Sequence, residues 1–296
     1  MLITEEVGGV PTNAGKKRMP KFPVLRKLTF IPLLGIGLLW NGNLQAQDTS
    51  ATQTEDVPSS VQNLSAREQS AAAIPWTKLT TEAREKLQGV VRNSSVFHQS
   101  PILKTPCDHN VYLHLIRYPE LVVNMWELMG VSKLRMDRQQ DYLIDIDDGY
   151  GTQSQLELVY GNKNLHIFYA EGAYKGSIIP TTSKGRVVLI LETSKSMRGQ
   201  QPIISHRLNL FIQFEKSANQ LVIKTLQGIF LKMVDMNFAE TTKFIGQIDD
   251  IIQDNPDGMK RLSGRLTRVQ TPIRQQFNKL IEQANAQYER VASNSD

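Results

Sequence analysis

A long one-sided helical pattern that begins at Asn237, within the stretch of residues 226–256, constrains the fold more than any other feature of the sequence. Asn237 and Glu240 have the spacing of a capping box, and Asn255-Pro256 ends the pattern. Between these ends, residues at three- and four-residue spacings share one helix face: Thr241, Phe244, Ile245, Ile248, Ile251 and Ile252. A run of predicted strands precedes the helix, so we expect this face to pack on an antiparallel sheet.

Short strand patterns dominate the chain before this helix. Residues 204–215 show the clearest alternation of apolar and polar residues, which is typical of a strand with one buried face. Residues 186–193 are apolar on both faces, as expected of a central strand. The predicted strands are 96–104, interrupted by Pro101, then 132–137, 142–146, 156–160, 165–169, 186–193, 204–215 and 220–227, with a polar loop at 194–202.

Helical patterns flank and interrupt these strands. Thr80 is the predicted N-cap of a helix that runs to about Val91, and Asp108 is the predicted N-cap of a short helix. A second short helix is expected at 121–129, and further helices are expected after Pro256. The sequence therefore predicts an α+β fold with an antiparallel sheet of about six to seven strands, a long C-terminal helix and extra helices at both ends.

The N-terminal region has the pattern of an export signal. Basic residues between Lys16 and Lys27 precede an apolar run, and Leu44-Gln45-Ala46 ends in a small residue suitable for cleavage. The apolar run is too short for a typical membrane-spanning helix. We expect residues 1–46 to be a cleaved signal peptide, with an uncleaved anchor as the alternative. Both Met1 and Met19 are candidate start residues.

Removal of this segment changes the charge of the protein. The whole chain carries a net charge of +5, but residues 1–46 contain six basic and only two acidic residues, so the remainder carries +1. This balance gives no reason to expect nucleic-acid binding. Cys107 is the only cysteine, which excludes an intramolecular disulfide and a lipid anchor at the cleavage site. We expect an exported protein, periplasmic or extracellular, that is soluble after cleavage.

Composition then divides the rest of the chain. Residues 47–75 are rich in Ser, Thr, Gln and Ala, so they are predicted to be a disordered linker. Residues 76–256 are expected to form the folded domain, and residues 257–296 a C-terminal helical extension. The basic residues of this extension predict either a weak contact with an anionic membrane or envelope surface, or the solvated side of helices packed on the domain: Lys260, Arg261, Arg265, Arg268, Arg274 and Lys279.

The order of elements resembles the helix-grip fold of the START and polyketide-cyclase-like superfamily. The resemblance covers roughly Val96 to Pro256 and rests on Thr105–Tyr112, on Tyr118-Pro119-Glu120 with Trp126, and on Gly228–Ile252. It implies a curved sheet that grips the long helix, with an apolar cavity between them. The superfamily has no universal catalytic set, so the resemblance assigns no catalytic residue.

Polar side chains on apolar strand faces are the candidate ligand contacts. His206 lies on the apolar face of the clearest strand, where it is either a ligand-contacting or acid–base group or a hydrogen-bonded core histidine. Glu171 shares a strand face with Tyr169 and is a candidate second polar group. With the apolar residues expected around them, the predicted ligand-binding set is His206, Glu171, Tyr169, Leu208, Leu210, Phe244 and Ile248.

Other chemistry has little support in the sequence. Cys107 beside a histidine suggests a nucleophile, but Asp108 is better explained as a helix cap. His109 and His114 do not share one helical face, as zinc ligands require, and the aspartates at 145–148 do not match a calcium loop. No motif of a well-marked enzyme class occurs. We therefore predict no catalytic residue, no metal site and no cofactor.

Three functions remain open on the sequence alone. The first, supported mainly by the resemblance, is an exported protein that binds an apolar or amphipathic, lipid-like small molecule between sheet and helix. The second is a cyclase- or hydrolase-type enzyme that uses His206 in the same cavity. The third is a ligand-free structural or interaction protein of the cell envelope. We favour binding over enzymatic activity.

Overall fold

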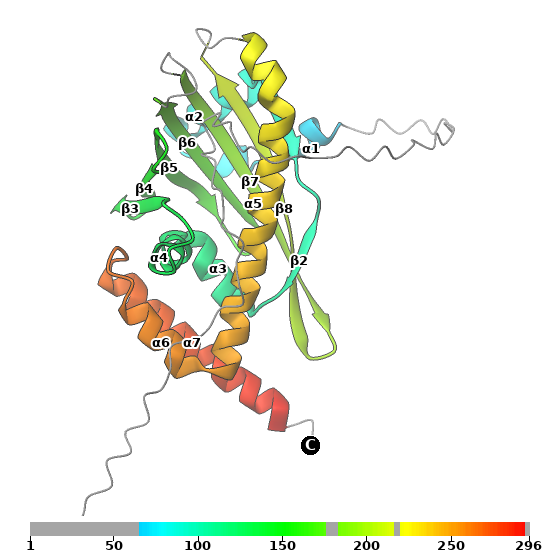
Figure 1. Cartoon of the computed structure of the whole chain (residues 1–296). Helices are drawn as coiled ribbons and strands as arrows, with labels where there is room; N and C mark the ends of the chain where they lie inside the picture. Colours follow the sequence, from blue (N-terminus) through cyan, green and yellow to red (C-terminus); the bar gives the residue numbers. More distant parts are fainter. Residues whose placement is uncertain (1–64, 176–182, 216–219, 294–296) are drawn as a thin grey trace, which may run out of the picture.

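An antiparallel sheet with helices on both faces forms the described part of the chain (Figure 1). The computed structural model describes residues 65–175, 183–215 and 220–293, without the side chains of 220–229 and of residue 292. The predicted signal peptide, residues 1–46, and most of the predicted linker lie outside the described residues. The α+β class predicted from the sequence is confirmed.

The sheet has eight strands, with the order β1-β8-β7-β6-β5-β4-β3, and β2 pairs with β8 beyond the end of β1. All adjacent strands are antiparallel. The strands are β1 (Val96–Gln99), β2 (Leu103–Pro106), β3 (Arg135–Gln140), β4 (Leu143–Asp147), β5 (Thr152–Gly161), β6 (Leu165–Tyr174), β7 (Ser183–Arg198) and β8 (Gln201–Phe214).

The helices lie before, between and after the strands. They are α1 (Ala66–Ala72), a short 3-10 turn (Trp76–Lys78), α2 (Thr81–Asn93), α3 (His109–Arg117), α4 (Glu120–Leu128), α5 (Gln220–Asp254), α6 (Pro256–Gly264) and α7 (Thr271–Ser293). The predicted caps are confirmed, because Thr80 accepts the Ala83 N–H and Asp108 accepts the Asn110 and Val111 N–H groups.

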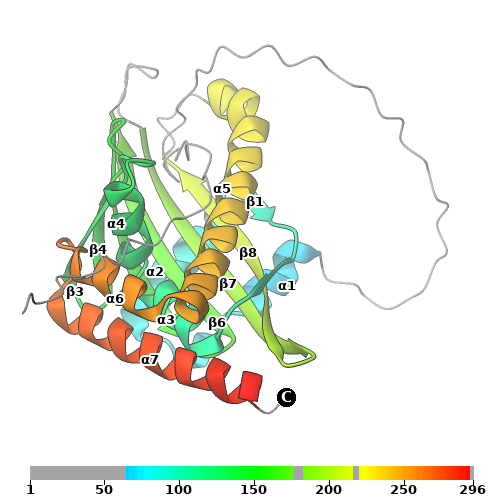
Figure 2. The ribbon, with the colours of Figure 1, turned by 60° about the horizontal axis from the view of Figure 1, so that its bottom comes forward.

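The two faces of the sheet have different covers. Directly paired residues of antiparallel strands point to the same face, so the row Tyr169, Val188 and Phe211 marks one face. This outer face is covered by α2, which buries Leu87 against it. The opposite, inner face faces the first half of α5, which crosses the sheet in Figures 1 and 2.

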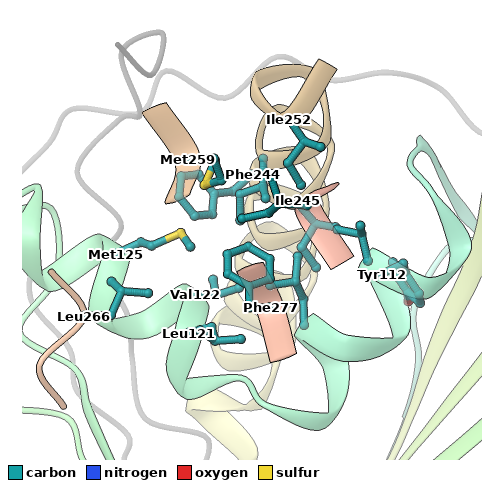
Figure 3. Close-up of a cluster of buried hydrophobic side chains, with 14 of the residues drawn as sticks. Tyr112, Leu121, Val122, Met125, Phe244, Ile245, Ile252, Met259, Leu266 and Phe277 are labelled. Atoms are coloured by element: carbon teal, nitrogen blue, oxygen red, sulfur yellow. The ribbon is translucent and has the colours of Figure 1, made fainter. Parts of the chain in front are cut away.

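The second half of α5 belongs to a helical cluster instead. Phe244 and Ile248 pack with α3, α4, α6 and α7, and Phe277 of α7 lies at the centre of this cluster (Figure 3). The sequence predicted that Phe244 and Ile248 face the sheet. Ile204 of β8 and a second layer of helices share this cluster, so the sheet is only part of the cover over this half of α5.

A buried carboxylate joins three helices of the cluster. Asp249 of α5 accepts the backbone N–H of Asp108 at 3.1 Å and the hydroxyl of Tyr288 at 2.6 Å. Burial raises the pKa of Asp249, while these hydrogen bonds lower it. The contacts fix the start of α3 and the far end of α7 to α5. They also satisfy the hydrogen-bonding capacity of the carboxylate, as buried polar groups normally require.

The C-terminal helices are therefore part of the main core. Ile273, Phe277 and Ile281 of α7 are buried in the same cluster as α3 and α4. Several of the basic residues form contacts within the fold: Lys260 pairs with Asp257 and Glu282, and Arg268 pairs with Glu127 and Asp137. The predicted division at residue 256 therefore separates segments that share one core.

Three local predictions are wrong. Residues 220–227 are the start of α5, not a strand, because a short β-branched run fits either structure and here continues into a helix without a break. Because α5 begins at Gln220, Asn237 lies inside the helix and does not cap it. Residues 194–202 are a hairpin, not a loop: Gly199, with φ of 60°, precedes Gln200 in the tight turn between β7 and β8.

The linker prediction for residues 47–75 is wrong over its last part. Ser65 and Glu68 form a capping box at the start of α1, and Arg67 donates to the carbonyl of Val91 at 3.2 Å. Ile74 is buried in the outer-face cluster. The polar composition of this stretch led to the linker prediction, but its cap and these contacts stabilise a short helix.

Truncation of Phe277 tests whether α7 belongs to the core. Phe277→Ala should lower the free energy of unfolding by about 3–5 kcal/mol, because the ring is fully buried and stacks on His114. Gln276→Ala, at the neighbouring exposed position, should change it by less than about 0.5 kcal/mol. Urea unfolding followed by circular dichroism gives both values. Equal effects would place α7 outside the core.

Candidate functional site

The candidate site is the apolar surface between the inner face of the sheet and the first half of α5. We call it the inner surface. The strands contribute alternate residues, and α5 contributes residues at helical spacing. Its buried members are Val96, Ala170, Val187, Leu208, Leu210, Ile212, Phe230 and Val234, and its partly exposed members are Leu156, Leu189, Phe214, Leu231 and Phe238.

Several apolar residues of this surface are only partly buried. Leu189 lies in the middle of β7, a strand with neighbours on both sides, and yet it is only partly buried. Its neighbours Val188 and Ile190 point to the outer face and are fully buried beneath α2. Because the strand is central, the exposure of Leu189 arises from an incomplete cover on the inner face.

His206 lies at the end of this surface, where α5 passes α3. Its ring stacks on Tyr112 with centroids 5.4 Å apart, and Phe238 meets it edge-on at 5.4 Å. Its Nε2 is 3.0 Å from the hydroxyl of Thr242, and the side chain is enclosed, with the residue only 2% exposed. His206 is therefore a hydrogen-bonded core histidine, which was one of the two interpretations that the sequence left open.

Burial determines the charge of this imidazole. It lowers the pKa of His206 from 6.5 to about 4, so the ring is neutral at neutral pH. Nδ1 is buried and has no hydrogen-bond partner among the described residues. A neutral, enclosed imidazole fixes the position of Phe238 and Thr242 on α5. It lacks the solvent access that a general acid or base requires.

Glu171 and Tyr169 lie on the other face of the sheet. The Tyr169 hydroxyl donates to Glu171 at 2.6 Å, and Arg186 also donates to Glu171 at 3.2 Å. The hydrogen bond from Tyr169 is the main reason that the pKa of Glu171 is lowered. The structure therefore does not bring His206 and Glu171 together. The alternation pattern correctly placed Glu171 and Tyr169 on one face of β6. It carries no information on which face of β6 lies on the same side of the sheet as a given face of β8.

The predicted ligand-binding set is thus divided among three places. Leu208 and Leu210 lie on the inner surface, and His206 lies at its end. Phe244 and Ile248 lie in the helical cluster. The sequence interpretation missed Leu189 because its strand is apolar on both faces, and it missed Phe230 and Val234 because it began the helix only at Asn237.

The remaining polar groups have structural roles. Cys107 is fully buried, and burial raises the pKa of its thiol, which opposes a nucleophilic role. Asp147 accepts the N–H of Gly149, and Asp148 accepts those of Tyr150 and Thr152, so these carboxylates stabilise a turn. Within the described ranges no cluster of three potential metal ligands occurs, and no helix there is long and apolar enough to span a membrane.

Acid unfolding tests the buried state of His206. Between pH 6.5 and 4 only the unfolded chain binds a proton at this position, so stability falls as the pH falls through this range. His206→Gln should reduce that slope by up to about 1.4 kcal/mol per pH unit. Leu208→Ala, two residues along the same face, should lower stability without changing the slope. An unchanged slope in His206→Gln would contradict the neutral buried state.

Comparison with known proteins gives only a loose likeness. No protein-family model and no curated protein matches the chain. A conserved protein from Geobacillus kaustophilus aligns with 51% of this chain and 95% of its own, at 10% identity and a TM-score of 0.34. Norcoclaurine synthase from Thalictrum flavum (52% and 94%, 12% identity, TM-score 0.29) and Ara h 8.0201 (49% and 99%, 9% identity, TM-score 0.27) also align. At such scores these likenesses carry no argument about the family or the function of this chain.

Proposed function

We propose that the protein binds an apolar or amphipathic small molecule on the inner surface, between the sheet and the first half of α5. The incomplete burial of Leu189 in the middle of the sheet is the observation that carries this proposal. A residue in a central strand is normally buried by the layer that packs on its face of the sheet, as Val188 and Ile190 are on the outer face. A ligand would complete the cover on the inner side.

The chemistry of the inner surface indicates the class of ligand. Leucine, valine and phenylalanine side chains form it, and each 100 Å² of apolar area that a ligand removes from water contributes about 2.5 kcal/mol. Polar side chains adjoin this surface at two places: His206 at its end, which is neutral, and His98, which is paired with Leu210 and contacts Asp235 of α5 at 2.7 Å. An apolar body, lipid-like in character, fits this surface better than a multiply charged molecule does.

The enzyme alternative has less support. A cyclase- or hydrolase-type mechanism would use His206 as acid or base, but the imidazole is enclosed by Tyr112, Phe238 and Thr242. Binding without catalysis therefore agrees best with the geometry. We further propose that the protein is exported and acts in the periplasm or the extracellular space, on the basis of the basic and apolar segments between Lys16 and Ala46.

A blocking substitution tests the binding site. Leu189→Trp should lower the affinity for a fluorescent anthroyloxy-stearate probe at least about tenfold, because the larger ring fills the inner surface. Val159→Trp makes a similar enlargement on the outer face and should change the affinity by less than about twofold. Fluorescence titration measures both, and thermal melts confirm that both variants are folded.

Native mass spectrometry provides the independent control. Protein purified from its own host should carry a small-molecule adduct that Leu189→Trp lacks. A mass equal to that of the bare chain, together with no uptake of the probe, would contradict the proposal and favour a ligand-free envelope protein.

N-terminal sequencing tests export. The mature protein should begin at or near Gln47, because the pattern for cleavage ends at Ala46. It should be found in the soluble periplasmic or extracellular fraction. Chains that begin at Met1 or Met19 and remain in the cytosol would contradict the proposed location.

A further inference from the structure

An open groove of about 510 Å³ runs between β2 and α5 on the edge of the sheet, away from the inner surface. One wall is formed by the four consecutive residues of β2, Leu103 to Pro106. Since neighbouring residues of a strand point to opposite faces, a wall made of all four must lie along the edge of the strand. The other wall is a single stripe of α5: Ala239, Thr242, Lys243, Gly246, Gln247 and Asp250.

The two walls are held at a fixed separation. The hydroxyl of Thr105 donates to the carbonyl of Thr242 at 3.3 Å, and a side chain on Gly246 would come within 2.8 Å of the same hydroxyl. Close approach of helix and strand therefore requires glycine at 246. The helical stripe spans twelve residues, from Ala239 to Asp250, or roughly 16 Å, which is the length of about five residues of extended chain.

Several backbone groups on the strand edge in this groove have no backbone hydrogen-bond partner among the described residues. The N–H of Cys107 donates to Pro202 at 3.2 Å, which makes this a hydrogen-bonded pair of the β2–β8 ladder. Hydrogen-bonded pairs alternate, so Thr105 also bonds to β8, whereas the N–H and C=O of Lys104 and the C=O of Pro106 point away from it. In the described part of the chain, β2 pairs with no strand other than β8.

A further acceptor lies on the helical wall. Gln247 Oε1 is buried and has no hydrogen-bond partner among the described residues. A buried acceptor without a donor costs about 1–3 kcal/mol, so a donor brought by a partner would relieve that cost. An extended peptide presents N–H and C=O groups alternately along each edge. These groups can pair with the C=O and N–H of Lys104 and with this amide oxygen.

The charges of the groove are ordered along its length. Thr105 contacts Thr242, and Asp108 contacts Asp249 further along, so β2 and α5 run in the same direction. Lys243 lies on the helical wall and is exposed, whereas Lys104, which pairs with Ser205, points to the outer face of the sheet, away from α5. Asp250 lies seven residues beyond Lys243, roughly 10 Å along the helix. The helical wall thus carries an ammonium group before Gly246 and a carboxylate after it.

We propose that this groove binds an extended peptide segment of a partner protein, which adds to the free edge of β2 and places an acidic side chain beside Lys243. Backbone hydrogen bonds to β2 give affinity in this mode of recognition, and Lys243 gives specificity. The site is separate from the inner surface, so peptide and small molecule occupy different sides of α5.

Fluorescence polarisation with defined peptides tests the groove. The probe is a fluorescein-labelled pentapeptide, Val-Thr-Glu-Thr-Val, added to the mature full-length protein. It should bind at least about tenfold more tightly than the same peptide with Lys in place of Glu. N-methylation of alternate backbone nitrogens should abolish binding, because it removes the donors that β2 and Gln247 require.

Matched variants assign the binding to these residues. Lys243→Glu should reverse the preference, so that the Lys peptide binds more tightly than the Glu peptide. Lys232→Glu, an exposed lysine of α5 outside the groove, should leave the preference unchanged. Ala239→Trp should block both peptides by filling the groove. Thermal melts of each variant confirm that the fold is intact.

Three results would overturn the proposal. The first is that neither peptide binds up to about 1 mM. The second is that both bind equally well, or that Lys243→Glu leaves the preference unchanged. The third is a dimer in sedimentation equilibrium that Ala239→Trp converts to a monomer, which would make the occupant a second copy of this chain.

Discussion

Burial of a single face of α5 is the constraint on which the other layers depend. The helix has 35 residues and is roughly 52 Å long, about the length of the 16-residue strand β7 that it crosses. No single layer covers its whole apolar face. The sheet meets the first half through Phe230 and Val234, and the helices α3, α4, α6 and α7 meet the second half around Phe244 and Ile248. The helical cluster covers the part of this face that the sheet does not cover.

Polar contacts fix α5 in its position between these layers. His98 of β1 is 2.7 Å from Asp235, and His206 of β8 is 3.0 Å from Thr242, so two strands hold the helix along one side. Asp249 then joins it to α3 and α7. Apolar packing alone would let a helix rotate or slide over a leucine-rich surface. Hydrogen bonds at three positions along the helix remove that freedom, because each requires one particular side chain of α5 to lie beside one particular partner.

Local patterns in the sequence predicted most of the elements, whereas features that depend on residues far apart in the chain could not be predicted. The caps at Thr80 and Asp108 and the alternation in β8 depend on neighbouring residues, so they could be predicted. The Ser65–Glu68 capping box was equally visible but was overlooked in a polar stretch. By contrast, the opposite orientations of Glu171 and His206 depend on the register of three strands. The division of α5 between two layers depends on which strands and helices pack on each half, which no local pattern reports.

The arrangement of α5 also has a mechanical meaning. One half is enclosed by four helices and joined to them through Asp249, while the other half lies against the sheet through apolar residues and the contact of His98 with Asp235. A rod clamped at one end deflects most at the other. For a guest to reach the leucines by lifting this half, the His98–Asp235 contact and a few apolar contacts would have to break, whereas the helical cluster that keeps the chain folded would stay closed.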